Sequence, residues 1–224
     1  MWRDALLVAG KDLRIEARSR VVVNQVAPFA VLVLVLFAFA LGPDRRAMAH
    51  AAPGLFWLAV LFCSLLAVQR SFAVEAGEGT RDGLRLSGLD PAGIFFGKTA
   101  AIVLELLVLE VLLAVGVVLL YGNGVRAPGV LVATSVAGTA GLAAVGTLYG
   151  ALSSGLRVRE TLLPLLLLPV AAPVLLAGTR AWQAALGTGP SSGSDPWTAV
   201  LVVFAVVYLA LGVVVYGPLL EAAS

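Results

Sequence analysis

Two acidic residues, Glu105 and Glu110, lie inside one long apolar run at 98–121. A carboxyl group in membrane hydrocarbon costs about 3 kcal/mol unless it is neutral, paired or facing water, so both are candidate functional residues. Their spacing of five residues places them about 140° apart around an ideal helix, which does not favour the close carboxylate pair of a two-acid hydrolase. The alternative is a structural role, with one or both protonated against hydroxyl groups of the next apolar run: Thr134, Ser135 or Thr139.

A second pattern, at 92–99, is a near match to the phosphate-binding loop of nucleotide-hydrolysing proteins. It ends in Gly97-Lys98-Thr99 but has Ala92 where the first glycine is usual. A true phosphate loop follows a buried strand, is rich in glycine and works with a separate acidic motif for magnesium. Here the interior is Ile-Phe-Phe and the segment opens an apolar run. The pattern therefore does not predict a nucleotide site.

The remaining chemically reactive candidates are single residues. His50 is the only histidine and precedes an apolar run, and no second metal ligand stands near it in the sequence. A lone histidine of this kind is more typical of a surface position than of a metal or haem ligand. Cys63 is the only cysteine, so no disulfide can form within the chain. The sequence predicts no catalytic residue and no metal site.

Long apolar runs position all of these residues. A crossing segment must be a helix of roughly 20 apolar residues, because hydrocarbon cannot hydrogen-bond the backbone. Hydrophobic residues make up 60% of the 224 residues, against roughly 45–50% in an ordinary soluble domain. We therefore expect an all-α membrane protein with one permease domain over 21–218 and no soluble domain. Its six transmembrane helices are expected at about 21–41, 52–68, 98–121, 129–152, 161–178 and 197–216.

Residues 1–20 predict an amphipathic helix that lies on the inner membrane surface. Its apolar face carries Trp2, Leu6, Ala9, Leu13 and Ala17, and its opposite face carries Arg3, Lys11, Arg14 and Arg18. This interfacial helix either only fixes the orientation of the chain or acts as a lever joined to the first span.

The distribution of basic residues predicts the orientation. Eleven of the 15 lysine and arginine residues fall on the side of the N-terminus and four on the other. Since basic residues are retained on the cytoplasmic side, both termini are expected in the cytoplasm. The formal net charge of +2 follows from this bias, and no motif suggests a nucleic-acid partner.

The longest cytoplasmic connection, 69–97, is the least apolar part of the chain. It mixes charged and leucine side chains as a short helix that docks on a soluble partner would. The residues expected at that interface are Glu75, Glu78, Arg81, Asp82, Leu84, Arg85 and Leu86. Asp90-Pro91 predicts a helix start, because aspartate caps helix N-termini and proline suits the first helical position. The third membrane helix should thus begin before its span.

The fourth and fifth spans carry unusual residues. Gly146 and Gly150 form a Gly-xxx-Gly step that lets helix backbones approach closely, either inside the bundle or between two copies of the chain. The fifth span contains three prolines that either form a kinked gate or are tolerated in a static helix: Pro164, Pro169 and Pro173. The segment 179–196 is expected to be an outer loop with a short apolar piece around Trp182 and a flexible connection.

Several short motifs follow one another along the spans. They are 52–57 (Ala-Pro-Gly-Leu-Phe-Trp), 64–67 (Ser-Leu-Leu-Ala) followed by Arg70, Gly97-Lys98, 155–157 (Gly-Leu-Arg), 162–169 with Pro164 and Pro169, and 173–175 (Pro-Val-Leu). In this order the chain resembles, over essentially its whole length, the CcmB family of haem exporter permeases. Members usually carry glutamate in place of Gln69, a glutamate-containing Asp-Gly-x-Leu-Glu run where this chain has Arg81-Asp82-Gly83-Leu84-Arg85, and a proline near Gly88. This chain therefore departs from the pattern in its cytoplasmic connection.

The resemblance implies an ABC-2-like permease bundle in the bacterial inner membrane, without catalytic residues of its own. It implies that ATP and magnesium are bound by a partner ATPase, CcmA, and that residues 75–86 form the coupling helix to it. The expected membrane partners are the haem-handling proteins CcmC and CcmD, and the haem-loaded chaperone CcmE is released on the periplasmic side. Haem is then handled by the complex and not bound directly by this chain. A second copy of the chain and membrane lipids complete the expected contacts.

Two other functions remain open at this stage: a general ABC-2-like exporter of a lipid or drug, and an intramembrane hydrolase that uses Glu105 and Glu110. Glutamine keeps the shape of glutamate but can neither transfer a proton nor act as a nucleophile. We expect cells carrying Glu105→Gln together with Glu110→Gln to keep their yield of mature cytochrome c, measured by haem staining. A complete loss of activity in correctly inserted protein would instead favour the hydrolase.

Overall fold

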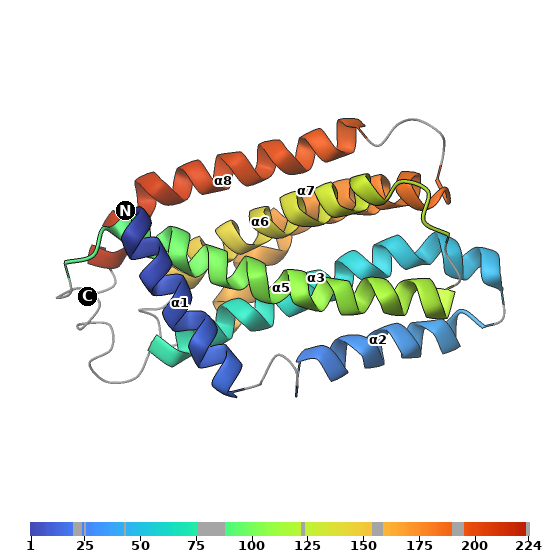
Figure 1. The fold of residues 1–224 in the computed structure, drawn as a ribbon, viewed down its shortest axis with the longest axis horizontal. Helices are drawn as coiled ribbons and strands as arrows, with labels where there is room; N and C mark the ends of the chain where they lie inside the picture. Colours follow the sequence, from blue (N-terminus) through green and yellow to red (C-terminus); the bar gives the residue numbers. More distant parts are fainter. Residues whose placement is uncertain are drawn as a thin grey trace.

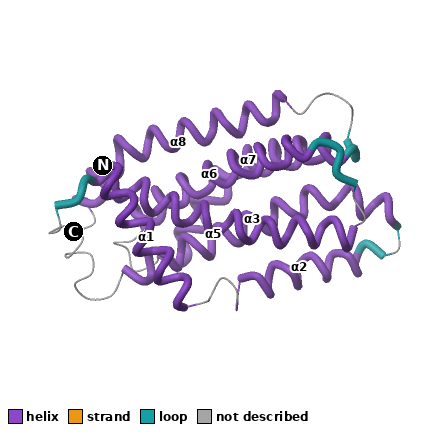
Figure 2. Tube along the Cα trace, viewed as in Figure 1, coloured by secondary structure: helices purple, strands orange, loops and turns teal. Residues whose placement is uncertain are grey.

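The computed structural model describes residues 1–19, 24, 26–42, 44–75, 88–121, 124–153, 159–189 and 195–222. Within these ranges it contains helices and loops but no strand, as Figure 2 shows. The helices are α1 (Trp2–Ser19), α2 (Ala27–Ala40), α3 (Arg45–Glu75), α5 (Pro91–Tyr121), α6 (Pro128–Ser153), α7 (Arg159–Leu186) and α8 (Asp195–Ala222). The prediction of an all-α protein is confirmed.

The long helices run side by side as one bundle, and α1 crosses over α5 at an oblique angle (Figure 1). Helix α6 contacts α3, α5, α7 and α8, and α5 contacts α1, α2, α3, α6 and α8. Helix α2 lies against α3 and α5. The start of α1, the start of α5 and the end of α8 meet at one end of the bundle, where the ring of Trp2 stacks on Phe96 at 5.8 Å and that of Phe95 lies 5.5 Å from Tyr216.

Within the described ranges, five helices are long and apolar enough to cross a membrane, which identifies a multi-pass membrane protein. They cover Arg45–Ala73, Pro91–Tyr121, Pro128–Ser153, Thr161–Leu186 and Pro196–Leu220. The segment predicted as the first span is helical over Ala27–Ala40, 14 residues, or about 21 Å, against a hydrocarbon thickness of about 30 Å. Its start at 21–23 lies outside the described residues. The sixth crossing, the interfacial position of α1 and the cytoplasmic location of the termini remain predictions.

The end of the fifth span differs from the prediction. Helix α7 continues to Leu186, so the expectation of an outer loop from 179 with a separate apolar piece is wrong. Trp182 extends the helix because its ring is buried and stacks on Phe56 with a centroid distance of 3.7 Å. The helix then stops at Gly187, whose φ of +70° favours glycine. The Gly187 amide donates to Ala184 O and that of Thr188 to Gln183 O, the two bonds of a Schellman end.

The connection between the second and third predicted spans is also shorter than 69–97. Helix α3 runs on to Glu75 and α5 begins at Pro91, so both ends of the predicted connection are helical. The predicted helix start at Asp90-Pro91 is confirmed: the Asp90 side chain accepts a hydrogen bond from the Ala92 amide at 3.1 Å. Residues 76–87 lie outside the described part of the chain.

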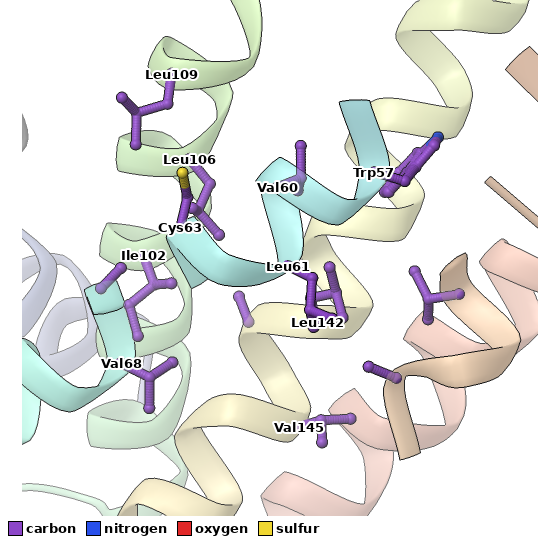
Figure 3. Packing of buried hydrophobic residues seen from close by; sticks show 14 of the residues in the cluster. Trp57, Val60, Leu61, Cys63, Val68, Ile102, Leu106, Leu109, Leu142 and Val145 are labelled. Carbon is purple, nitrogen blue, oxygen red and sulfur yellow. The ribbon is translucent and has the colours of Figure 1, made fainter. Parts of the chain in front are cut away.

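Helix α6 turns its small residues toward the inside of the bundle. Side chains on Gly146 and Gly150 would overlap Val68 and Phe72 of α3, and one on Gly141 would come within 2.7 Å of Phe204 on α8. Figure 3 shows the apolar packing that results around Val68, Leu142 and Val145. Of the two alternatives for the Gly-xxx-Gly step, the structure therefore supports packing within the bundle.

This close packing predicts that Gly146→Leu destabilises the bundle by about 2 kcal/mol, since extra side-chain volume in a filled interface forces neighbours apart. The matched control is Gly129→Leu on the same helix, where an added Cβ has nothing within 4 Å. Thermal unfolding of the purified chain in detergent should give a lower midpoint for Gly146→Leu alone. Equal midpoints would contradict the packing of α6 on α3.

Candidate functional site between helices α1, α3 and α5

Helix α1 lies directly on the backbone of α5. A Cβ added at Gly93 would be 2.8 Å from Met1 O, and one added at Gly97 would be 2.6 Å from Ala5 O. The two glycines are one turn apart on α5, and because they have no side chains the backbone of α1 can approach closely there. The side of α1 that faces these glycines buries Ala5, Val8 and Ala9.

The rest of α1 does not match a simple two-faced helix. Ala9, predicted on the apolar face, packs against the bundle, whereas Trp2 and Leu6 are 70% and 75% exposed. Arg14 and Arg18 are also exposed on the basic flank. Helix α1 thus has three sides: one packed on α5, one apolar and one basic.

Lys98 lies beside Gly97 and is 0% exposed. Its ammonium nitrogen lies 3.5 Å from Asp12 Oδ2 of α1, donates to Ser71 Oγ of α3 at 3.3 Å and lies 4.8 Å from the ring centroid of Phe72. A buried ammonium requires a counter-charge and hydrogen-bond acceptors. Lys98 therefore joins α5 to both α1 and α3.

The residues of the phosphate-loop-like pattern all have packing roles. Gly93 and Gly97 receive α1, Lys98 pairs with Asp12, and the Thr99 hydroxyl donates to Thr147 Oγ1 of α6 at 3.2 Å. They occupy the first turns of the continuous helix α5 and not a loop after a strand. This geometry explains the lysine and glycines without a bound nucleotide.

A second set of contacts ties the end of α1 to α3. Arg70 Nε lies 2.9 Å from Glu16 Oε2, and Arg70 Nη2 donates to Ser19 Oγ at 2.6 Å. Asp12 is also 3.1 Å from Lys11. Two ion pairs from neighbouring turns of α1, one to α3 and one to α5, hold the three helices together.

The start of α1 is fixed by further polar contacts. The Met1 amine lies 3.2 Å from Asp4 Oδ2 and 3.6 Å from Asp90 Oδ2, and the Asp90 amide donates to Asp4 Oδ2. The hydrogen bond with the Met1 amine, with a smaller contribution from the Asp90 amide, holds the pKa of Asp4 below its usual value. The N-terminus of α1 and the N-terminus of α5 are thereby joined.

Glu105 belongs to the same group of charges. It lines a small cavity of about 20 Å³ with Asp12, Glu16 and Arg70, enough room for about one water molecule. Its electrostatic partners are Glu16, Asp12, Arg70 and Lys98. We call these five residues, Asp12, Glu16, Arg70, Lys98 and Glu105, the α1 cluster. Glu105 is therefore half-buried among charged groups although its neighbours in sequence are apolar.

Glu110 lies elsewhere. Its side chain is 4% exposed, and its carboxyl accepts a hydrogen bond from the Thr139 hydroxyl of α6, with Ser135 as a second hydroxyl partner. Thr134 instead donates to backbone carbonyls of its own helix. The two intramembrane acids thus face different helices, as their spacing predicts.

The other candidates are dispersed. His50 is exposed in the first turns of α3, and Cys63 is buried in the apolar core (Figure 3). Among the described residues, no group of three histidine, cysteine or acidic side chains could hold a metal ion. The three prolines at 164, 169 and 173 lie within the one helix α7, and their role as a gate stays a prediction.

The predicted docking residues fall at the edge of the described structure. Glu75 ends α3, five residues after Arg70. The other six lie in 76–87, outside the described residues: Glu78, Arg81, Asp82, Leu84, Arg85 and Leu86. Their role in coupling remains a prediction.

Sequence reasoning missed most of the α1 cluster. Lys98 was a usable signal, because a basic residue at the head of an apolar run needs a partner. Asp12 and Glu16 were a second usable signal. They are acidic residues in an otherwise basic helix, one turn apart, and they lie on the same side of it as Ala5 and Ala9. The pairing itself depends on how α1 crosses α3 and α5.

Comparison with known proteins gives consistent results. The sequence model described as CcmB protein matches residues 3–222. The protein named heme exporter protein B in Pseudomonas aeruginosa is 33% identical over 201 residues, 90% of each chain. The protein of the same name in Paracoccus denitrificans is 31% identical over 206 residues, 90% of this chain and 89% of that one.

A further relative of this name, from Bradyrhizobium diazoefficiens, is 32% identical over 200 residues, 88% of this chain and 85% of that one. The matches span all the helices of the bundle and α1. The chain therefore belongs to the CcmB protein family.

Proposed function

We propose that the chain is the permease subunit of an ABC-type haem export complex that acts in cytochrome c maturation in the bacterial inner membrane. Its membership of the CcmB family, whose relatives are named heme exporter protein B, carries this proposal. In it, the separate ATPase CcmA binds ATP and magnesium. CcmC and CcmD handle haem, and the permease uses the ATPase cycle to release the haem-loaded chaperone CcmE on the periplasmic side.

The packing of α1 supports a role in transmitting force. The predicted coupling residues lie in or beside the segment that links α3 to α5. Close to that segment, the ion pair of Arg70 with Glu16 joins α3 to α1. The ion pair of Lys98 with Asp12 joins α5 to α1. A displacement of the connection by the ATPase therefore moves α1, α3 and α5 as one unit, a two-state change of the kind that ligand binding can drive.

The composition supports force transmission over a haem channel. Haem iron in proteins is held by histidine, methionine, cysteine or tyrosine side chains. The chain has one histidine, one cysteine, two methionines and four tyrosines, and its histidine and methionines form no row along a span. In the proposal, haem is bound by other subunits and the permease changes their arrangement. A general lipid or drug exporter is the competing function.

The test of this function is purification of the tagged chain from its native membrane in mild detergent. We expect an ATPase and haem-handling membrane proteins to co-elute, and a haem absorbance band to follow them. An ATPase without any haem protein would overturn the proposal and favour the general exporter, which transport of a lipid or drug into vesicles lacking the haem subunits would then establish.

The coupling segment gives a more specific prediction. Replacing Arg81, Asp82 and Arg85 together with alanine should uncouple ATP hydrolysis from chaperone release and leave haem loading intact, because the charged contacts to the ATPase are lost. Haem-loaded chaperone should then accumulate in the complex while ATPase activity persists. The control is a triple alanine variant at the other end of the bundle, Arg45, Arg46 and Arg180. Failure of loading with intact release would refute this role.

The ion pair of α1 gives a second prediction. Lys98→Met should lower the stability of the bundle by about 3 kcal/mol, because it leaves Asp12 without its buried partner. The matched control is Lys11→Met, which removes the other lysine beside Asp12 but from an exposed position, and should cost less than about 1 kcal/mol. Thermal unfolding in detergent measures both.

The exchanged pair, Asp12→Lys with Lys98→Asp, separates the charge interaction from side-chain packing. It should recover part of the stability that Lys98→Asp loses, together with cytochrome c maturation, if the pair fastens α1 to α5. No recovery, and no difference between the two lysine-to-methionine variants, would show that the pair contributes nothing.

A further inference from the structure

We propose that Glu110 is a proton-binding site inside the bundle: its carboxyl group is a neutral acid, and the bound proton allows α5 and α6 to pack together. The inference rests on the geometry of this side chain and is independent of the proposed transport function. Glu110 faces α6, away from the α1 cluster, and takes no part in the proposed coupling. The proposal develops the structural alternative that the sequence raises, a protonated glutamate against hydroxyl groups of the next helix.

The two carboxyl oxygens of Glu110 differ in their surroundings. Oε1 accepts the hydrogen bond of the Thr139 hydroxyl, and Ser135 one turn earlier on α6 is the second hydroxyl that faces the group. Oε2 is buried and has no hydrogen-bond partner among the described residues. If the group were ionised, Oε2 would carry negative charge in a buried position without a hydrogen bond. A proton on Oε2 removes that charge.

No described element that packs against α5 brings a positive charge to this position. Helices α2 and α6 have no acidic, basic or histidine side chain along their whole length. The charged residues of α3 lie near its ends, at Arg45, Arg46, His50, Arg70 and Glu75, and those of α8 lie at Asp195 and Glu221. The charges that α1 brings to α5, Asp12 and Glu16, interact with Glu105.

The titratable neighbour of Glu110 is the buried thiol of Cys63 on α3. The four tyrosines have other neighbours: Tyr121 donates to Leu34 O, Tyr149 of α6 interacts with Tyr208, Tyr208 also packs on Phe204, and Tyr216 lies against Phe95. None of these groups can neutralise a carboxylate at this position. An ionised, unpaired carboxylate in low-dielectric surroundings costs several kcal/mol, so the neutral form is the one compatible with the packed helices.

Proton binding and helix packing are therefore linked. While α5 and α6 are in contact, the neutral carboxyl bonds across their interface. If the helices separate and water reaches Glu110, the carboxyl can ionise and lose its proton, so deprotonation favours the separated arrangement. Glu105 is the internal contrast, since acidic and basic groups surround it together: Glu16 and Asp12 with Arg70 and Lys98.

Infrared spectroscopy of the purified full chain, in a detergent without ester groups, tests the proposal. At neutral pH, solvent-facing carboxyl groups are ionised, so a carbonyl stretch of a protonated acid identifies a buried neutral one. We expect this band in the wild type, its loss in Glu110→Gln and its retention in Glu105→Gln. No acid band in the folded wild type, or a band unchanged in folded Glu110→Gln, overturns the proposal.

Two further measurements keep the test decisive if Glu110→Gln folds poorly. Thr139→Val removes the hydroxyl that bonds Oε1 and should shift the acid band to higher frequency without abolishing it. Raising the pH from about 6 to about 9 should lower the thermal midpoint of the wild type more than that of Glu110→Gln, because the folded state holds a proton that the unfolded state releases. An unshifted band in Thr139→Val, or the same pH response in both chains, contradicts the proposal.

Discussion

A lysine ammonium without solvent exposure must find its counter-charge inside the protein, and in this bundle the position of Lys98 imposes that requirement on three helices at once. Asp12 of α1 provides the charge, and Ser71 and Phe72 of α3 complete the surroundings. Helix α1 can supply Asp12 only by lying against α5, which is why glycines stand where the backbones cross. The amphipathic N-terminal helix is thus an integral part of the bundle.

Buried ion pairs are weak sources of net stability, because removing two charges from water offsets most of their attraction. Their stronger effect here is on geometry. A shift of α1 along α5 would move Asp12 away from Lys98 and Val8 away from Gly97, so the ion pair and the glycine contacts favour the same helix crossing. The Arg70 to Glu16 pair then extends the same constraint to α3. This explains how three helices that meet near the predicted coupling segment can move as one body.

The parts of the fold that depend on local sequence could be predicted, and those that depend on crossing helices could not. Apolar length predicted the long helices, and Asp90 predicted the start of α5 because capping involves residues two apart. The extension of α7 depends on the stacking of Trp182 on Phe56, 126 residues away in the chain, which no local pattern reveals. Likewise, the position of Lys98 within a phosphate-loop-like pattern gave no indication that its ion-pair partner would be Asp12. The docking residues at 78–86 lie outside the described structure, so their prediction rests on the pattern of charged and leucine side chains and on the family resemblance.

The two glutamates of α5 show how one helix can carry two kinds of acid. Both lie within the same apolar run of the sequence, and the run by itself predicts the same environment for the two side chains. The angle between them on the helix separates their neighbours: Glu105 faces α1 and α3 with their charges, and Glu110 faces the hydroxyl groups of α6. The first belongs to the α1 cluster, next to the predicted coupling segment, and the second to the contact between α5 and α6. A rotation of α5 that disturbed one environment would disturb the other, so the α1 cluster and the bundle interior are mechanically connected through this helix.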